Sequence, residues 1–353
     1  MCPNVPMLSL YRKRQLRRKL RNKVQKLAPK EACQLVYELL NIFEEAQLET
    51  LFLALDSRGG NCTGCIPPQP PLLGVDPQNI VVAMCKAYRW LDISSTTQLR
   101  KMPFCDHPIC LNPFHYTKFT DIPLTSLNMF QEDFNLNDEE MFETEVGFGS
   151  MSTSIDDDND VIIPSPRTPP PAAPYPMRTR SHSAGWCSLA YWEGRNRIGR
   201  LFPVHEDYVN VFEFLPKGDG LCLAAMTSSN PESKKVKKTI GHGVTIAIDR
   251  LRQVWLFNRG EHAIFVHSPV LEPATSRIQL VHKLHSDHCM RVFDFGLATK
   301  LRTVKPHVGP YEAQSVRLSF TKGWGGPNYR RQCITTCPCW LEILFNANSN
   351  DSS

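Results

Sequence analysis

Residues 121–185 constrain the fold more than any other stretch, because they offer little that could form a buried core. Between Asp121 and Asp160 there are twelve acidic residues and no Lys or Arg. The stretch then passes into the sequence IPSPRTPPPAAPYPM, whose prolines favour an extended polyproline II conformation. Acid-rich and proline-rich chains with few apolar residues do not collapse. The sequence therefore predicts a disordered acidic and Pro-rich linker with a separate folded module on each side.

The length and the charge distribution agree with two modules. A chain of 353 residues is long enough for two domains, each with its own core. The net charge of +5 hides a segregated pattern, because ten Lys and Arg crowd between Arg12 and Lys30 without one acid. No secretory hydrophobic region opens the chain, and its apolar runs are too short to span a bilayer. We therefore expect a soluble, intracellular protein without membrane insertion.

The first 90 residues show mainly helical periodicity. Residues 8–30 combine the dense Lys and Arg with apolar side chains at helical spacing, which suits a nuclear-import signal, phosphate contacts or an ordinary solvated helix face. Residues 30–55 repeat apolar positions with a period near 3.6, which predicts one or two amphipathic helices joined around Glu45. From Ile80 to Trp90 the apolar run has a β-like character, so a strand is expected there.

Cysteines and a histidine before the linker form the main candidate metal site. The thirteen cysteines are irregularly spaced, and in a reducing compartment clustered cysteines are more often metal ligands than disulfides. Thiolates and imidazole bind Zn²⁺ tetrahedrally, and four protein ligands leave no open position for catalysis. Cys62 competes with Cys65 for one place, and unrelated buried cysteines with a surface histidine are the alternative. The proposed Zn²⁺ ligands are Cys65, Cys105, Cys110 and His115.

From Trp186 onward, short β-rich runs alternate with Gly, Pro, Asn and Asp, which favours a β-sandwich. Helical insertions are expected around residues 233–238 and 294–301. The fold class is therefore α+β. The predicted organisation is a basic segment 1–30, a zinc domain 31–120, the linker 121–185, a β-sandwich domain 186–347 and a short tail 348–353.

One loop near the end of the chain has the composition of a binding site. Two apolar β-type runs flank it between Ser319 and Phe345, and its glycines permit bends at positive φ. Large aromatic side chains and basic side chains in one loop are typical of a binding hot spot. A glycine-rich hairpin with ordinary surface arginines is the alternative. The candidate partner-binding residues are Lys322, Gly323, Trp324, Tyr329, Arg330 and Arg331.

A lysine cluster is the second candidate for partner binding. Together with the basic loop it would form one groove for a phosphorylated partner, whereas a solvated helix face is the alternative. The cluster comprises Lys234, Lys235, Lys237 and Lys238. No nucleophile motif, Walker loop or dinucleotide fingerprint occurs, so catalysis is not expected. A zinc-dependent nuclease is a third reading of the small Cys/His domain, but a closed four-ligand site argues against it.

Several of these stretches resemble the Smad family. The sequences WCSLAYWEGRNRIGRLFPV, LPKGDGLCLAAM, IGHGVTIAI, AIFVHSP, LVHKL, FTKGWGG and CPCWLEILFN are similar to the second Mad-homology (MH2) domain. LALDSRGG, CKAYRW and CLNPFHYTKF resemble the first Mad-homology (MH1) domain. The resemblance implies a zinc-containing α/β MH1-like domain and a β-sandwich of the Smad/FHA type. It also matches the zinc positions and favours Cys65, five residues after SRGG.

Three details resemble the inhibitory class of Smads: the SRGG motif, the stretch RQVWLFNRGEHAIFV, and an end at Ser353 without the Ser-x-Ser of receptor-regulated members. This implies a negative regulator of TGF-β/BMP-type signalling, located in cytoplasm and nucleus. It would bind the activated type I receptor serine/threonine kinase through residues 322–332 and the nearby lysines, and also other Smads. A DNA-binding, signal-transducing Smad is the alternative.

Two further motifs of the family depart from their usual pattern. The interval that carries the DNA-reading hairpin in DNA-binding Smads has no Lys or Arg from Gly59 to Met84. Base readout needs hydrogen-bond donors such as Arg and Lys, and phosphate contacts need their positive charge. DNA binding is therefore expected to be weak or absent. The Pro-Pro-x-Tyr motif that docks WW-domain ubiquitin ligases is broken between Pro169 and Tyr175. Ligase recruitment would therefore have to occur without a clean motif.

Overall fold

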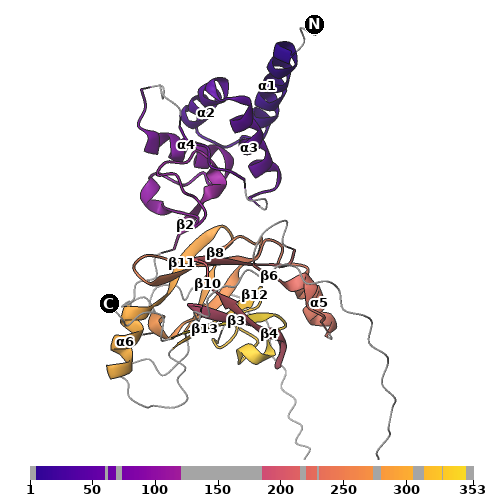
Figure 1. The fold of residues 1–353 in the computed structure, drawn as a ribbon, viewed down its shortest axis with the longest axis vertical. Helices are drawn as coiled ribbons and strands as arrows, with labels where there is room; N and C mark the ends of the chain where they lie inside the picture. The colour runs from indigo at the N-terminus through magenta and orange to yellow at the C-terminus, as the bar shows by residue number, and fades with distance from the viewer. Residues whose placement is uncertain are drawn as a thin grey trace, which may run out of the picture. The chain divides into compact units, whose positions relative to one another are not determined.

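A computed structural model describes residues 5–59, 63–68, 74–120, 185–214, 220–228, 230–272, 280–304, 314–327 and 329–346. Figure 1 shows helices gathered in the indigo and magenta part of the chain and strands in the orange and yellow part. Cys62, the predicted linker with Pro169–Tyr175, and the tail 348–353 lie outside the described residues. Within the described residues, no helix combines the length and the apolar character needed to cross a membrane.

Four α-helices form the first part: α1 (Val5–Asn22), α2 (Lys30–Ile42), α3 (Glu45–Asp56) and α4 (Pro77–Tyr88). The predicted amphipathic stretch is two helices, because Phe43 is extended and Glu44 begins α3 with a capping box to Gln47. Their apolar faces meet in one core. It includes the fully buried side chains of Leu20, Val36, Leu40, Leu48, Leu51 and Ile80.

The prediction of a strand over Ile80–Trp90 was wrong, because most of this run lies in α4. Asp76 caps the helix by accepting a hydrogen bond from the Gln78 amide at 2.9 Å, and Pro77 occupies its first turn. The buried positions Ile80, Val81, Met84 and Cys85 recur at helical spacing. Packing of this face against the core outweighs the β-propensity of the branched residues.

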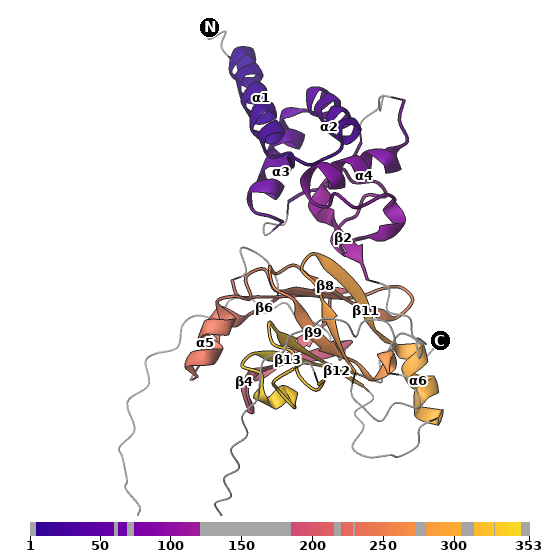
Figure 2. The ribbon, with the colours of Figure 1, turned by 180° about the vertical axis from the view of Figure 1, so that it is seen from behind.

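Two sheets organise the rest of the described chain, as seen from the two sides in Figures 1 and 2. One has the strand order β10-β9-β12-β13-β3-β4, and the other β1-β2-β11-β8-β7-β5-β6. The strands are β1 (Leu99–Lys101), β2 (Tyr116–Phe119), β3 (Cys187–Glu193), β4 (Asn196–Val204), β5 (Tyr208–Phe212), β6 (Gly220–Cys222), β7 (Val244–Ile248), β8 (Gln253–Asn258), β9 (Ile264–His267), β10 (Val281–Leu284), β11 (His288–Asp294), β12 (Ser315–Phe320) and β13 (Trp340–Phe345).

The predicted β-sandwich with helical insertions is confirmed. Apolar side chains of both sheets form one core, in which Leu189, Val211, Leu256, Val266 and Leu318 are completely or almost completely buried. The two insertions are α5 (Pro231–Lys237) and α6 (Phe295–Val304). Together with the helical first part, this is the α+β fold that the sequence predicted.

One sheet contains strands from both sides of the predicted linker, which the sequence did not suggest. β2 pairs in parallel with β11, with Lys118 opposite His288 and Phe119 opposite Cys289. Beside this pairing, the guanidinium of Arg89 lies 2.5 Å from the carboxylate of Asp287. The strand that follows the candidate metal ligands therefore continues a sheet of the β-sandwich.

Candidate metal centre and partner-binding surface

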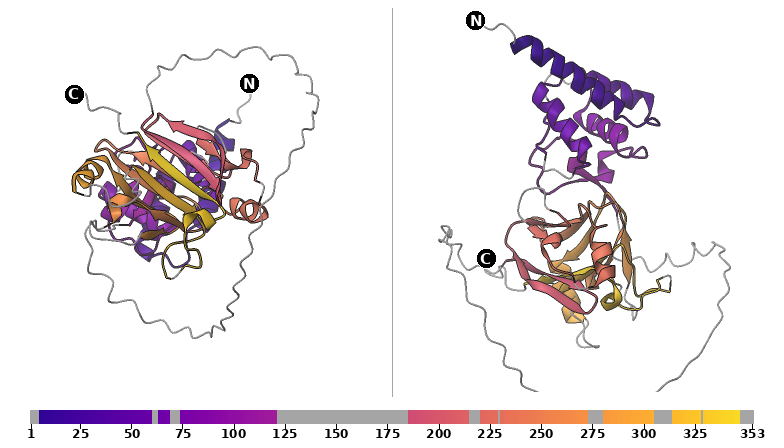
Figure 3. Two further views of the ribbon diagram at one scale, coloured as in Figure 1. Left: turned by 90° about the horizontal axis from the view of Figure 1, so that it is seen from below. Right: turned by 90° about the vertical axis from the view of Figure 1, so that its right-hand side faces the viewer.

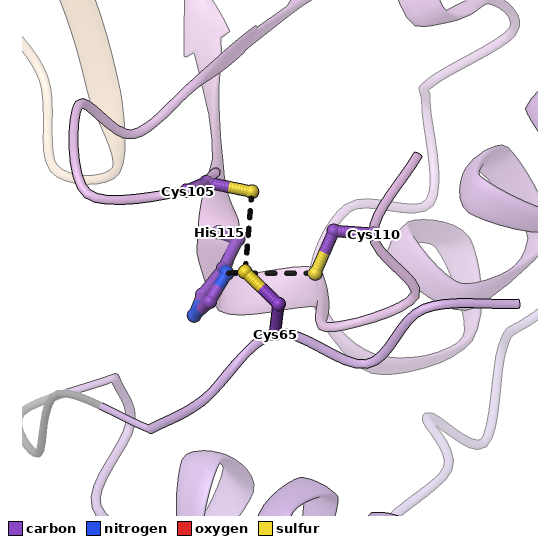
Figure 4. A group of neighbouring side chains, drawn as sticks. All are labelled: Cys65, Cys105, Cys110 and His115. Atoms are coloured by element: carbon purple, nitrogen blue, oxygen red, sulfur yellow. Dashed lines mark hydrogen bonds between the residues drawn. The ribbon is translucent and has the colours of Figure 1, made fainter. Parts of the chain in front are cut away.

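The structure brings together Cys65, Cys105, Cys110 and His115, whose ligand atoms all lie within 4.8 Å of one another. Figure 4 shows the three sulfur atoms gathered around one nitrogen of the His115 ring. The Cys65 sulfur lies 3.9 Å from the Cys105 sulfur and 3.5 Å from His115 Nδ1. Cys110 Sγ lies 3.4 Å from the same nitrogen. The residues come from three separate segments and meet only in the folded chain.

Buried polar contacts hold these segments in place. The side-chain amide of Asn112, which is fully buried, donates to the Thr63 hydroxyl at 2.9 Å and to the Gly64 carbonyl at 3.2 Å. His115 Nε2 lies 2.9 Å from the Thr63 carbonyl. A ring nitrogen that donates to a carbonyl leaves the other nitrogen free to bind a metal. The contact therefore orients Nδ1 as the ligand atom of His115.

The hydrogen bonds at the cluster favour a thiolate. A hydrogen bond from Cys105 lowers the pKa of the Cys110 thiol well below its usual range, against the opposing effect of burial. His115 and the Ile66 amide, which donates to Cys110 Sγ at 3.3 Å, act in the same direction as Cys105. The thiolate is the form of cysteine that binds metals.

The four residues fit a structural metal ion. In a tetrahedral zinc site with thiolate and imidazole ligands, neighbouring ligand atoms lie about 3.6–3.8 Å apart. The three separations of 3.4–3.9 Å agree with this spacing. Three of the four residues are buried. An ion bound by all four would crosslink the segments that carry them. Of the two alternatives Cys62 and Cys65, the described cluster contains Cys65.

The predicted binding loop is built on a small aromatic cluster. Trp324 is only 1% exposed and packs with Phe265, Ile334 and Trp340. The ring of Tyr329 meets that of Phe265 edge-on, with centroids 5.4 Å apart. The prediction that Trp324 offers its side chain to a partner was therefore wrong, since burial of a large ring stabilises the loop from within. Lys322 and Arg330 are exposed.

Gly323 makes this loop sensitive to a single methyl group. A Cβ at this position would lie 2.4 Å from the Tyr329 ring, closer than carbon atoms approach without displacement. We expect Gly323→Ala to displace Tyr329 and to destabilise the loop by about 1–3 kcal/mol. Hydrogen exchange of residues 322–337 would report this as faster exchange. Gly64→Ala is the matched control, since no atom lies within 4 Å of its added Cβ. Equal exchange rates in Gly323→Ala and the unchanged protein would contradict the expectation.

The lysine cluster lies on α5 and is connected to the loop. Arg331 forms an ion pair with Glu232 of α5 at 2.8 Å, and the Ser233 hydroxyl donates to the Pro338 carbonyl at 2.7 Å. Arg331 also donates to the Thr336 carbonyl at 3.1 Å. The helix and the loop, more than eighty residues apart in sequence, are therefore neighbours in the fold.

Lys237 does not belong to the exposed cluster, which corrects the prediction for this residue. It is 7% exposed, and its ammonium donates to the Met226 carbonyl at 2.7 Å and lies 3.2 Å from the carboxylate of Glu193. The exposed cations of α5 and the loop are Lys234, Lys235, Lys238, Lys322 and Arg330, with Arg331 partly covered. Glu193 and Glu232, which anchor this surface, were not identified from the sequence, because nothing in their local context marks them.

Comparison with known proteins adds family information to this geometry. Residues 31–120 match the MH1 domain family, and residues 184–346 match the MH2 domain family. Mothers against decapentaplegic homolog 6 of Gallus gallus is 34% identical over 356 residues, which cover 91% of this chain and 77% of that protein. Mothers against decapentaplegic homolog 7 of Homo sapiens is 30% identical over 353 residues, covering 89% and 78%. Dwarfin sma-3 of Caenorhabditis elegans is 25% identical over 301 residues, covering 75% and 72%.

Proposed function

The chain belongs to the Smad family, and on this basis we propose that it is an inhibitory Smad that antagonises TGF-β/BMP-type receptor signalling. Smads regulate signalling and transcription and are not enzymes. The support for the inhibitory class is similarity to homologs 6 and 7 over about nine tenths of the chain, together with the SRGG motif and the stretch RQVWLFNRGEHAIFV.

The observation that carries the receptor-binding proposal is the exposed basic surface shared by α5 and the loop. Five of its cations are exposed, and the ion pair between Arg331 and Glu232 fixes the loop against the helix. Clustered Lys and Arg side chains bind phosphorylated segments through charge-assisted hydrogen bonds. In our proposal this surface holds the phosphorylated segment of the activated type I receptor kinase, and thereby blocks access of receptor-regulated Smads. Other Smads would be further partners of the same domain.

The metal proposal is a structural Zn²⁺ ion bound by Cys65, Cys105, Cys110 and His115. Its support is the ligand set and the three separations of 3.4–3.9 Å between ligand atoms, which agree with a tetrahedral zinc site. We also propose that DNA binding by the MH1 domain is weak, because the stretch from Gly59 to Met84 offers no cation. Smads occur in cytoplasm and nucleus, and we propose the same two locations for this chain, with ubiquitin ligases as further partners.

Receptor binding is tested best with side chains that form no hydrogen bond or ion pair with another described residue. We expect Lys322→Ala/Arg330→Ala and Lys234→Ala/Lys235→Ala each to weaken binding to the phosphorylated type I kinase domain by about tenfold or more, because each removes two phosphate-binding cations. Titration calorimetry with BMP-type and activin-type kinases in parallel measures the loss. Arg331 is unsuitable for this purpose, since its replacement also breaks the contact with Glu232.

The control is Arg12→Ala/Arg14→Ala, which removes the same charge from exposed positions of α1. It should leave the affinity for the kinase domain unchanged. Unaltered binding by both the loop and the α5 variants, with circular dichroism showing a folded protein, would refute the proposed surface.

A further inference from the structure

The outward side of α1 carries cations that no other part of the described structure neutralises. Arg12, Arg14 and Arg18 are exposed, and none has a hydrogen bond or an ion pair with a described residue. Lys13 and Lys23 of the same basic segment differ, because they lie 2.9 Å and 3.1 Å from the carboxylates of Glu44 and Asp56. The three arginines therefore present uncompensated charge to solvent.

Other cations of α1 have structural duties. Arg17 donates to the carbonyls of Leu40 and Asn41 at 2.8 Å and 2.7 Å, which completes the carboxyl end of α2. Arg21 donates to the Asn41 side chain at 3.1 Å. The basic run is thus divided between residues that hold the helices together and residues whose charge has no structural use.

Apolar surface is exposed beside the unused arginines. Leu10 is 68% exposed and Tyr11 is 61% exposed, and the Tyr11 hydroxyl accepts a hydrogen bond from Gln15 at 2.6 Å. Figure 3 (right) shows α1 at the outer edge of the helical group, with the other helices on one side of it. We call Leu10, Tyr11, Arg12, Arg14 and Arg18 the α1 face.

We propose that the α1 face docks on the surface of a bilayer that contains anionic phospholipids. Basic side chains near such a surface are attracted by its negative potential, and this attraction decays within a Debye length. Exposed leucine and tyrosine side chains enter the region of the headgroups, where tyrosine keeps its hydroxyl in water. The helix lies in the plane of the interface, with its opposite side still packed on α2 and α3.

Nucleic acid is the competing polyanion, and the composition of the α1 face disfavours it. The arginines would serve a phosphate backbone equally well. However, proteins that read nucleic acid place polar donors and acceptors between their cations to reach base edges. Here a leucine and a tyrosine are exposed among the arginines, and the amide of Gln15, which is also exposed, already donates to the Tyr11 hydroxyl. Duplex DNA is therefore included as an outcome of the test.

The lipid contact does not depend on the proposed receptor binding. If both hold, docking confines the chain near a membrane-bound receptor and raises its effective concentration there. Because the two surfaces share no residue, the experiments can refute the lipid proposal without refuting the receptor proposal, and the reverse.

The test is co-sedimentation of the full chain with phosphatidylcholine vesicles, with and without phosphatidylserine. We expect binding only to the anionic vesicles, and weaker binding at higher salt. Arg12→Gln/Arg14→Gln/Arg18→Gln should lower the partition coefficient about 100-fold, since each cation near the surface contributes about fivefold. Leu10→Gln/Tyr11→Gln should lower it about tenfold through the lost apolar contact.

The matched control removes three exposed arginines from strand β4 and the turn before it, as Arg195→Gln/Arg197→Gln/Arg200→Gln. It should retain vesicle binding. The proposal is overturned if anionic vesicles are not bound, if the α1 and β4 variants lose binding equally, or if Leu10→Gln/Tyr11→Gln binds as the unchanged chain does. Tight binding to duplex DNA that requires the three α1 arginines, without binding to vesicles, would assign the face to nucleic acid instead.

Discussion

Cys110→Ser is expected to abolish stoichiometric zinc binding and to unfold the segments around the metal cluster. Cys110 is fully buried, and its sulfur accepts a hydrogen bond from the Ile66 amide in addition to facing His115. A serine leaves three ligands, and the segments that carry Cys65 and Cys105 lose their crosslink. Because metal binding to a structural site is folding free energy, we expect a loss of about 5 kcal/mol or more.

The loss should be local. Helices α2, α3 and α4 share an apolar core in which Cys105 and Cys110 are only two of many buried side chains, so they retain part of their structure. Metal analysis of the purified chain gives the zinc content, and hydrogen exchange of residues 63–68 and 99–119 gives the local unfolding. Chelation of the unchanged protein should produce the same exchange pattern as the substitution, because both remove the crosslink.

Two controls separate the metal ligands from other cysteines. Cys33→Ser changes a half-buried thiol whose contact is the Ala28 carbonyl at 3.6 Å, and it should keep full zinc content. Cys62→Ser tests the alternative ligand that the sequence left open, and it should also keep zinc. Full metal content in both Cys110→Ser and His115→Ala would contradict the ligand set.

The sequence predicted most elements for which the local pattern and the packing agree. The basic and amphipathic helices before residue 60 and the short strands after Trp186 follow from their periodicity and turn residues. The α4 helix was missed because the run from Ile80 is rich in β-branched residues. Its buried positions nevertheless follow a helical spacing, and Asp76 with Pro77 is a helix-start signal.

The parallel pairing of β2 with β11 could not be derived in the same way. It joins residues about 170 positions apart, and neither short strand carries a pattern that specifies its partner. Long-range pairing of this kind is decided by the complete fold rather than by local propensity.

The residues of the candidate sites also divide into those that the sequence could predict and those that it could not. The four metal ligands were predictable because cysteine and histidine have few other reasons to cluster. The exposure of single lysines and aromatic rings was not predictable, because neighbouring residues on a helix or loop point in different directions. Lys237 and Lys238 are adjacent in the chain, yet Lys238 faces solvent and Lys237 is buried against Glu193.

Lys237→Met should therefore destabilise the β-sandwich domain rather than directly weaken partner binding by α5. The side chains of Lys237 and Glu193 are 9% and 2% exposed, and Glu193 also accepts hydrogen bonds from Ser228 and Tyr191. The second carboxylate oxygen of Glu193 has no hydrogen-bond partner among the described residues. Removal of the lysine leaves a buried carboxylate without its counter-charge, which costs about 3–5 kcal/mol.

Guanidinium chloride unfolding followed by tryptophan fluorescence measures this loss, since five of the six tryptophans lie after residue 185. Lys234→Met is the matched control, an identical substitution at an exposed position of the same helix, and it should change the free energy of unfolding by less than about 0.5 kcal/mol.

Glu193→Leu/Lys237→Met removes both charges, and it should recover part of the stability that Lys237→Met loses, because no unpaired charge remains. Equal stability of Lys237→Met and Lys234→Met would show that the pair with Glu193 does not support the domain. A double variant no more stable than Lys237→Met would instead assign the loss to packing of the lysine side chain and its hydrogen bond to Met226. In the expected case, the buried lysine positions α5, and the exposed lysines of the same helix are free to bind a partner.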